Sequence, residues 1–216
     1  MDGVGENYQD HPVVLMTFEG TSPTPEAAIL PSFRLFIKSQ PEHPCADFHI
    51  IPRPPTEMPG LKPMLPISAA LLEQRNRGRV YLETADPYAL PAVDCRMLED
   101  AGDIEAMLAA MRFVAHLVEG DAMREFYGPL LQPGANEDWV QYARSTFDSY
   151  HHGVGTCLMA PASNPKAVVD QHLRVHGIDN LWIADASIMP TVTHANTNLT
   201  TIMIGERAAD FLKEAA

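Results

Sequence analysis

The sequence has few cysteines and few basic residues, and each shortage excludes a class of protein. Its three cysteines, Cys45, Cys95 and Cys157, are odd in number, far apart and in no CxxC pair. They therefore indicate neither a disulfide framework nor a zinc ribbon. Lys and Arg total 15 against 28 Asp and Glu, which gives a formal net charge of -13. Because this charge repels phosphate backbones and anionic lipids, we expect no nucleic-acid or membrane partner.

Long apolar runs and targeting features are also missing. No apolar stretch approaches the roughly 20 residues that are needed to cross a bilayer. The N-terminal segment, residues 1–12, lacks a basic region followed by an apolar one. We therefore expect a cytoplasmic protein, and the 46% hydrophobic content is enough for a substantial core in one large or two small domains.

One histidine pair has a spacing that can serve zinc. His172 and His176 form an H-x3-H pattern, but no second pair of ligands lies at a matching distance in the sequence. We therefore expect no metal site.

Short apolar runs predict several strands in the first 85 residues. They span residues 13–18, 33–37, 48–51 and 80–83. The stretch from Pro52 to Pro66 is too rich in proline for a helix or a central strand, so it predicts a surface loop.

Helical periodicity is clearest from Asp103 to Glu119, where apolar residues recur on one face and Asp103 is placed to cap the N-terminus. A less regular helix is predicted over 137–147, a short apolar strand over 181–184 and a last helix over 200–214. Gly205 lies inside the last helix, where glycine costs about 1 kcal/mol relative to alanine, so we expect a close packing partner there.

Three segments stand apart from the rest of the chain: residues 3–12 (GVGENYQDHP), 151–159 (HHGVGTCLM) and 168–210. Each alone fits a structural interpretation as a glycine turn, a loop with incidental histidines, or a strand that ends at a proline. Histidines and glycines in loops usually serve the backbone, so each segment alone favours that interpretation. Their combination and order favour a functional one.

Together these segments resemble the C-terminal half of the glucose-methanol-choline (GMC) oxidoreductases. The resemblance rests on H-x-x-G-T, followed in order by VVD, LRV-x-G, DASIMP, an Asn and IMIGERAAD. The first segment resembles the family's GVGxNLQDHP and departs from it at Tyr8, where leucine is usual. The resemblance runs from the third residue almost to the last, and it implies an FAD-dependent oxidoreductase that acts on a small alcohol.

The resemblance also implies catalytic residues. In the family a hydride leaves the alcohol carbon for flavin N5, and a histidine takes the hydroxyl proton. Matching H-x-x-G-T places this base at His152, and matching IMP-x5-N places a second group at Asn196. An imidazole with an unperturbed pKa of ~6.5 suits the first role, and an amide that donates to a developing oxyanion suits the second. His151 is out of register, and His194 is expected to line the wall or face solvent.

For the cofactor, the resemblance implies that Asp185 and Ala186 approach FAD through backbone groups. Thr197 and Asn198 would approach the pyrimidine end of the isoalloxazine, where a helix N-terminus favours negative charge. Two residues of the first segment are further candidates for cofactor contacts: Gly3 and Asn7.

The family's nucleotide-binding G-x-G-x-x-G is not found in this sequence. Residues 3–8 have a similar spacing, but Tyr8 stands in place of the third glycine. We therefore expect the chain to carry the substrate-facing side and to need a separate or missing N-terminal FAD-binding half. Ile183 and Ile204 would then face an apolar surface that is unpaired in the chain alone.

These observations predict an α+β fold in which an antiparallel sheet carries helices on one face and a C-terminal strand-helix segment completes an FAD-binding domain. The expected segments are 1–12 beside the FAD domain, 13–150 as the substrate domain, and 151–216 as the catalytic loop and strand-helix. Two other functions stay open: a hydroxynitrile-lyase-like flavoprotein without net redox change, and a non-catalytic fragment. A serine hydrolase is not favoured because no G-x-S-x-G is present.

Overall fold

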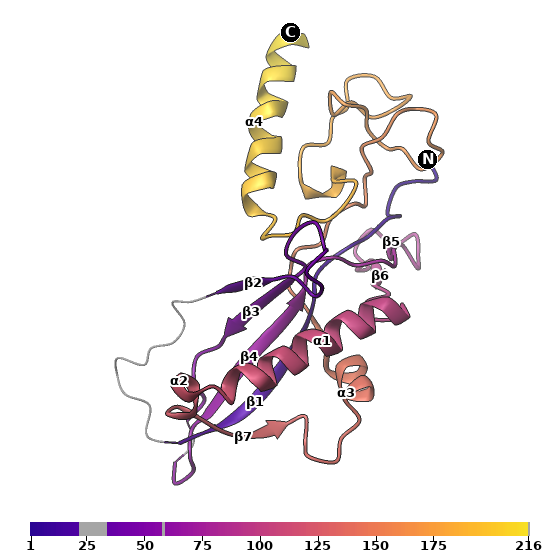
Figure 1. Ribbon diagram of the computed structural model, residues 1–216. Coiled ribbons are helices and arrows are strands. Elements are labelled where there is room, and N and C mark those ends of the chain that lie inside the picture. Colours follow the sequence, from indigo (N-terminus) through magenta and orange to yellow (C-terminus); the bar gives the residue numbers. More distant parts are fainter. Residues whose placement is uncertain (22–33, 58, 216) are drawn as a thin grey trace. The chain divides into compact units, whose positions relative to one another are not determined.

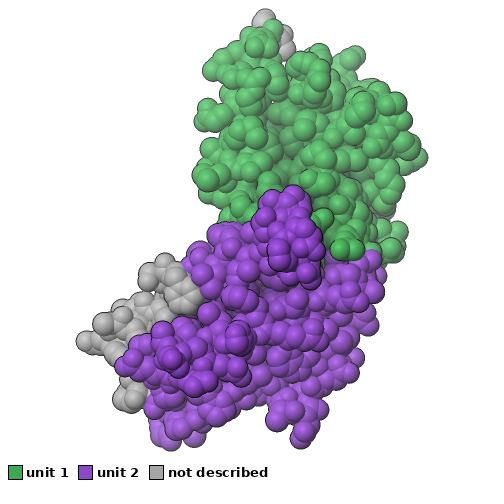
Figure 2. Space-filling model, in the orientation of Figure 1, with its two compact units in different colours: residues 1–11, 73–97, 151–216 green, residues 12–72, 98–150 purple. Residues whose placement is uncertain are grey.

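The computed structural model describes residues 1–21, 34–57 and 59–215 (Figure 1). The chain forms two compact units, and each contains segments that are distant in the sequence (Figure 2). Unit 1 comprises residues 1–11, 73–97 and 151–216, and unit 2 comprises residues 12–72 and 98–150. Residues 73–97 were expected to belong to the substrate domain, but they lie in unit 1. Unit 1 also contains the three motif segments, apart from Pro12, the last residue of the first segment.

Unit 2 is built around a six-stranded antiparallel sheet. Its strands are β1 (Pro12–Gly20), β2 (Leu35–Ile37), β3 (Phe48–Pro52), β4 (Met64–Leu71), β7 (Tyr127–Gln132) and β8 (Asp148–Ser149). The strand order is β2-β3-β4-β1-β7, and β8 pairs with β1. The predicted α+β class with an antiparallel sheet is confirmed, as are the strands over 13–18 and 48–51. Of the strand predicted over 33–37, Leu35–Ile37 form β2, and Phe33 lies outside the described residues.

The sheet buries one face through the alternation of strand side chains. On β1, Val14, Met16 and Phe18 point to the same side and are at most 1% exposed. Their partners on β4 are equally apolar and buried: Ala69, Ile67 and Leu65. A continuous apolar surface therefore runs across the two central strands.

Helix α1 (Ala101–Val118) covers this surface (Figure 1). Met107, Met111 and Val114 are fully buried at the spacing of one helix face, as the sequence predicted for this segment. The predicted cap was wrong. Asp100 caps the helix because its Oδ1 accepts from the backbone N–H groups of the second and third helical residues. Asp103 is the third of these residues, so its own N–H needs a cap, and its side chain is buried.

Two further helices belong to unit 2: α2 (Asp121–Arg124) and α3 (Trp139–Thr146). Helix α3 corresponds to the helix predicted over 137–147 and begins after Asp138, which caps it. It packs near α1 and β1, and the Tyr142 hydroxyl donates to the carbonyl of Leu15 at 2.7 Å.

The strand β4 corrects the prediction of a loop that extends to Pro66. Pro66 is the third residue of β4, and it pairs with Thr17 of β1. Its carbonyl accepts from Arg53 N–H on the side of β3. The N–H that proline lacks would point to the same side, beyond Pro52, where β3 ends. The proline therefore costs only the reciprocal bond to Arg53, just past the end of β3, which explains how a central strand tolerates it.

Unit 1 contains little regular structure. Its elements are the hairpin of β5 (Arg79–Tyr81) and β6 (Ala92–Asp94), the 3₁₀ turn η1 (Ala186–Ile188) and the long helix α4 (Asn198–Ala215). The strand predicted over 80–83 is confirmed in part, because β5 ends at Tyr81. The helix predicted over 200–214 is confirmed in full. The strand predicted over 181–184 is wrong, because only Trp182 forms a bridge there, with Arg174. A single bridge does not make a ladder, which a regular strand requires.

A small apolar cluster forms the core of unit 1. Ile204 of α4 is 6% exposed within it, and Ile183 packs against it. The prediction that both isoleucines face an unpaired apolar surface was therefore wrong. The exposed apolar residues of α4 lie elsewhere on the helix, at Leu199, Ile202, Met203 and Leu212.

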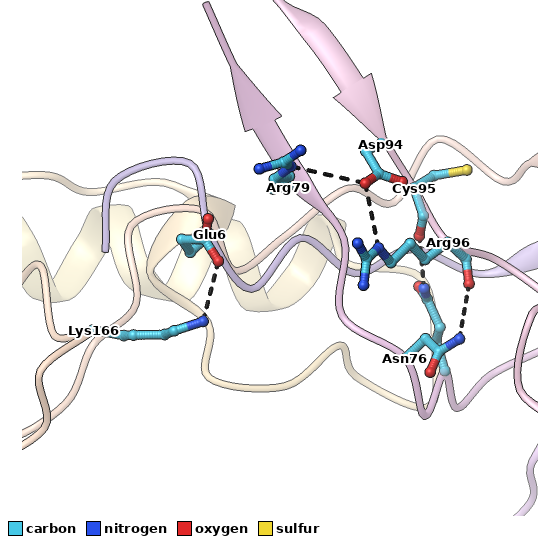
Figure 3. Close-up of polar contacts among 8 residues, drawn as sticks. Glu6, Asn76, Arg79, Asp94, Cys95, Arg96 and Lys166 are labelled. Atoms are coloured by element: carbon cyan, nitrogen blue, oxygen red, sulfur yellow. Dashed lines mark hydrogen bonds and ion pairs between the residues drawn. The ribbon is translucent and has the colours of Figure 1, made fainter. Parts of the chain in front are cut away.

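Unit 1 also contains exposed ion pairs (Figure 3). Asp94 Oδ2 lies 3.3 Å from Arg96 Nε and 3.8 Å from Arg79 Nε, and Glu6 Oε2 lies 3.1 Å from Lys166 Nζ. Exposed pairs of this kind contribute little to stability, so the polar contacts of buried residues matter more in unit 1.

Within the described ranges, the structure has no helix that is long and apolar enough to span a membrane. No group of three or more His, Cys, Asp or Glu side chains among those residues is placed to hold a metal ion. His176 Nε2 lies 3.0 Å from the carbonyl of Ala160, and the His172 ring packs edge-on to Phe211.

Candidate active site

The first motif segment lies between two other segments of unit 1. Tyr8 forms a pair of backbone hydrogen bonds with Gly78, and Gln9 forms a pair with Val154 of the second motif. Gly155 follows with a φ of 93°, and a Cβ there would lie 2.3 Å from the carbonyl oxygen of Asn7. The glycine of H-x-x-G-T is therefore required both by its backbone conformation and by the close approach of the first motif.

The carboxylate of Asp10 connects the first two motifs. Its Oδ1 accepts from the backbone N–H of His11 at 2.6 Å and from that of His152 at 3.0 Å. Its Oδ2 accepts from the Tyr8 hydroxyl at 3.2 Å. The Asp10 N–H donates to Oε1 of Gln74, whose amide in turn donates to the Cys95 carbonyl. Asp10 is 1% exposed, so these bonds offset the cost of burying its charge and hold the backbone of His152 in place.

Gln9 makes the corresponding connection to the third motif. Its Oε1 accepts from Val192 N–H at 3.1 Å, and its Nε2 donates to the Pro190 carbonyl at 3.0 Å. The Asn7 amide donates to the same carbonyl at 3.3 Å. The loop that leads to Asn196 is therefore bound to the first motif through side chains.

His152 and Asn196, the two catalytic residues that the motif match assigned, lie in contact. His152 Nε2 is 3.1 Å from Asn196 Nδ2. The other ring nitrogen, Nδ1, is 2.9 Å from Nδ1 of His11, whose Nε2 is 2.9 Å from the Thr193 carbonyl. The His152 side chain is half-buried, and Asn196 is exposed. The pair therefore presents one imidazole nitrogen and one amide at the surface of unit 1.

Burial keeps both imidazoles neutral near pH 7. Desolvation is the largest effect on His152 and lowers its pKa, against the opposing charge of Asp10. Desolvation also lowers the pKa of His11 to about 4, and His152 lowers it further, while Asp10 and the Thr193 carbonyl act in the opposite direction. A neutral His152 can accept a proton, which a general base must do.

The two neighbouring histidines are placed differently. His151 is exposed and has a φ of 62°, so its backbone is in a turn and not in an extended strand. His194 is half-buried, and its charge would lower the pKa of His11. The imidazole in contact with Asn196 is that of His152.

The residues expected near the cofactor lie at the ends of η1 and α4. Asp185 is exposed, and its Oδ1 accepts from Ser187 N–H at 2.8 Å as the cap of η1. The Ala186 carbonyl accepts from Gly155 N–H at 3.4 Å, which joins it to the second motif.

The other expected cofactor residues begin α4 or belong to the first segment. The Thr197 carbonyl accepts both the N–H and the hydroxyl of Thr201 at 2.9 Å, and Asn198 is the first residue of the helix. In the first segment, Gly3 packs against the backbone of Lys166, and the Asn7 amide contacts the loop of the third motif.

Sequence reasoning assigned no role to Gln9, Asp10 or His11, although all three lie in the first motif. Each is at most 1% exposed. Three consecutive polar side chains that are all buried indicate a network, but burial cannot be read from a loop without periodicity. The one signal in the sequence was that these three residues precede Pro12 within a segment that resembles a family motif.

The family described as GMC oxidoreductase matches residues 74–205, which is more than half of the chain. The chain belongs to the GMC oxidoreductase family. Human mitochondrial choline dehydrogenase is 30% identical to it and matches 99% of the chain. Choline oxidase from Arthrobacter globiformis is 32% identical over 99% of the chain, and alcohol dehydrogenase [acceptor] from Pseudomonas putida is 34% identical over 82%. The resemblance inferred from the motifs is confirmed.

Solved structures show the same fold. Pyridoxine 4-oxidase from Mesorbium loti superposes with a TM-score of 0.85 at 21% identity and covers 96% of this chain. A formate oxidase superposes with a TM-score of 0.83 at 18% identity and covers 99% of this chain.

The chain spans only part of the proteins that it matches. It covers 41% of the human choline dehydrogenase, 42% of the choline oxidase and 43% of the pyridoxine 4-oxidase. It corresponds to the C-terminal portion of GMC oxidoreductases.

Proposed function

We propose that this chain is the C-terminal catalytic half of an FAD-dependent enzyme that oxidises a CH–OH group to a carbonyl. The observation that carries the proposal is the approach of His152 Nε2 and Asn196 Nδ2 to 3.1 Å at the surface of unit 1. A hydroxyl that binds beside this pair, in place of their mutual contact, can donate to the imidazole and accept from the amide. These are the two contacts that alcohol oxidation requires of the protein at the reacting oxygen.

In this proposal His152 is the general base. Its Nε2 accepts the hydroxyl proton, while Asn196 donates to the oxygen as negative charge develops there. Asp10 holds the His152 backbone from behind, so the imidazole needs little reorganisation when the alcohol binds. Hydride departure becomes easier as the oxygen acquires alkoxide character, which ties the proton transfer to the redox step.

The residues at the start of α4 fit a flavin. The first turn contains no acidic side chain, and the N–H groups at the start of a helix carry partial positive charge. Thr197 and Asn198 would hold the pyrimidine end of the ring there, and the backbone of Asp185 and Ala186 would approach the cofactor from η1. When bound, FAD supplies the acceptor for the hydride. The N-terminal FAD-binding half would come from a separate or missing polypeptide segment, consistent with the share of the relatives that this chain covers.

The first test is the visible spectrum of the chain, alone and mixed with the N-terminal half of a GMC oxidoreductase, before and after addition of a simple alcohol. We expect oxidised flavin to be retained in the mixture and bleached by the alcohol. His152→Ala should slow bleaching by about 10²-fold to 10⁴-fold, because general base catalysis contributes that much.

His151→Ala is the matched control, since it removes the adjacent exposed imidazole. If His151→Ala abolished bleaching and His152→Ala retained it, the base would be His151 and the assignment to His152 would be wrong. Flavin that is retained but never bleached by alcohols, while the mixture cleaves a cyanohydrin, would support a lyase instead. Failure of the mixture to retain flavin would favour a non-catalytic fragment.

A further inference from the structure

Four groups of unit 1 form a continuous line of close polar contacts that ends at Asn196. It begins at the Thr193 carbonyl, passes through both nitrogens of His11 and both nitrogens of His152, and has three separations of 2.9, 2.9 and 3.1 Å. Each separation is short enough for a hydrogen bond, so each must contain one donor and one acceptor. This requirement determines where the ring protons lie.

The first contact has only one solution. A carbonyl oxygen can accept but cannot donate, so His11 Nε2 must carry a proton toward Thr193. His11 is fully buried, and its pKa of about 4 leaves the ring neutral at pH 7, with a single N–H. The opposite tautomer would place the Nε2 lone pair 2.9 Å from the oxygen lone pairs. His11 Nδ1 is therefore an acceptor.

The second contact then follows from the first. His11 Nδ1 has no proton to offer, so His152 Nδ1 must donate across the 2.9 Å between them. The two rings lie at 83° to each other, with centroids 5.1 Å apart, which allows the nitrogen of one ring to face that of the other. A neutral His152 with its proton on Nδ1 has a lone pair on Nε2, directed at the Asn196 amide.

We propose that His11 is a positioning residue that selects the tautomer of His152 in which Nδ1 is protonated and Nε2 is free to accept the substrate proton. The catalytic meaning of this inference rests on the proposed function, whereas the tautomer is a property of the chain itself. Without such a partner His152 could place its proton on Nε2, where it would donate to the alcohol oxygen and could not act as a base.

The surroundings of His11 explain how it can hold this role. Its backbone N–H is bound by Asp10, which also binds the backbone N–H of His152, so one carboxylate sets the spacing of the two histidines. The Thr193 carbonyl belongs to the loop that Gln9 binds at Pro190 and Val192. Both histidines and the loop that carries Thr193 are therefore anchored to the same short segment of the first motif.

The decisive measurement is the ¹⁵N spectrum of the full chain labelled at histidine, recorded near pH 7.5 through two-bond couplings to the ring protons. We expect His152 to show a protonated Nδ1 and an unprotonated Nε2, and His11 to show the reverse. Assignment uses the signals lost in His152→Ala and His11→Gln. A wild-type His152 protonated at Nε2 would overturn the proposal without any cofactor or substrate.

Two substitutions at His11 separate positioning from packing. Glutamine can accept from His152 Nδ1 and donate to Thr193, so His11→Gln should keep the Nδ1–H signal of His152. Leucine fills similar space but cannot accept, so His11→Leu should move the His152 proton wholly or partly to Nε2. An unchanged His152 tautomer in a folded His11→Leu variant would overturn the proposal. If that variant does not fold, the wild-type and glutamine spectra still decide.

Activity provides a second readout in the mixture with the N-terminal half. His11→Leu should reduce kcat by about 10²-fold or more with little change in KM, because substrate contacts stay while the base is lost, and His11→Gln should restore most of it. The expected tautomer in a mixture that never oxidises alcohols would refute the proposed function and leave the positioning role intact. An active mixture in which His152 carries its proton on Nε2 would refute the positioning role and leave the proposed function intact.

Discussion

The two units of the chain differ in the kind of contact that stabilises each of them internally. Unit 2 buries a continuous apolar surface between β1, β4 and α1, and its side chains follow the periods of strands and helices. Unit 1 has a smaller apolar cluster, and its three motif segments are joined through the buried polar residues Gln9, Asp10 and His11. The comparison teaches that the core of unit 2 depends on volume and pattern, whereas unit 1 depends on the identity of particular donors and acceptors.

The largest effect should come from a cavity in unit 2. Ile67 of β4 is fully buried beside its β1 partner Met16, in the apolar core that includes α1. We expect Ile67→Ala to lower the free energy of unfolding by about 2–5 kcal/mol, measured by urea denaturation. Leu61→Ala is the control, because Leu61 is 65% exposed. A loss under about 1 kcal/mol for Ile67→Ala would show that unit 2 is not a closely packed core.

The next effect tests the polar character of unit 1 through pH. The pKa of His11 is about 4 in the folded chain and 6.5 in the unfolded chain, so the unfolded state binds more protons between these values. His11 therefore leaves stability intact above pH 6.5 and reduces it as the pH falls from 6.5 toward 4, by up to about 3 kcal/mol.

The measurement is urea denaturation at pH 8 and pH 4.5 for the wild type and for His11→Gln. The wild type should lose more stability between the two pH values, because glutamine does not titrate. His152 also has a lowered pKa and contributes in the same direction in both proteins, so the difference reports His11 together with its coupling to His152. Equal losses would mean that His11 is not buried as a neutral imidazole.

Pattern alone predicted much of unit 2. The apolar runs of β1 and β3 and the helical period of α1 reflect burial, and both signals can be counted along the sequence. β4 was missed because Pro66 argued against a central strand, and the fact that makes it acceptable, the end of β3 at Pro52, depends on another segment. Strand pairing of this kind is not encoded locally.

The candidate site was predicted only through motif resemblance. His152 and Asn196 are 44 residues apart, and nothing in their local sequence indicates a 3.1 Å contact. His11 and Asp10 lay in a recognised segment, but their roles depend on what they touch in the second and third motifs. The strand expected over 181–184 was inferred from apolar composition, although a strand requires a paired neighbour as well.

A smaller effect isolates one polar contact of unit 1. The Tyr8 hydroxyl donates to Asp10 Oδ2, and burial raises the pKa of this phenol. Tyr8→Phe keeps the ring against Gly153 and removes only the hydrogen bond, so we expect a loss of about 1 kcal/mol in the free energy of unfolding. Tyr88→Phe is the matched control, because Tyr88 is 93% exposed. Identical stability changes in the two variants would show that this bond adds nothing to the polar network.

The smallest effect concerns α4, the element of unit 1 that most resembles the regular helices of unit 2. A Cβ at Gly205 would have no heavy atom of the described residues within 4 Å, beyond its own helix and chain neighbours, so the packing partner expected there is not found among them. Gly205→Ala should therefore stabilise the chain by about 0.5–1 kcal/mol in urea denaturation, since alanine loses less backbone entropy in a helix. Ala209→Gly, at another exposed position of the helix, should cost a similar amount.

If the N-terminal half packs closely against Gly205, Gly205→Ala should weaken the retention of the chain by that half by a measurable factor. Stabilisation of the chain without weaker retention would show that this glycine makes no close contact in the assembled enzyme.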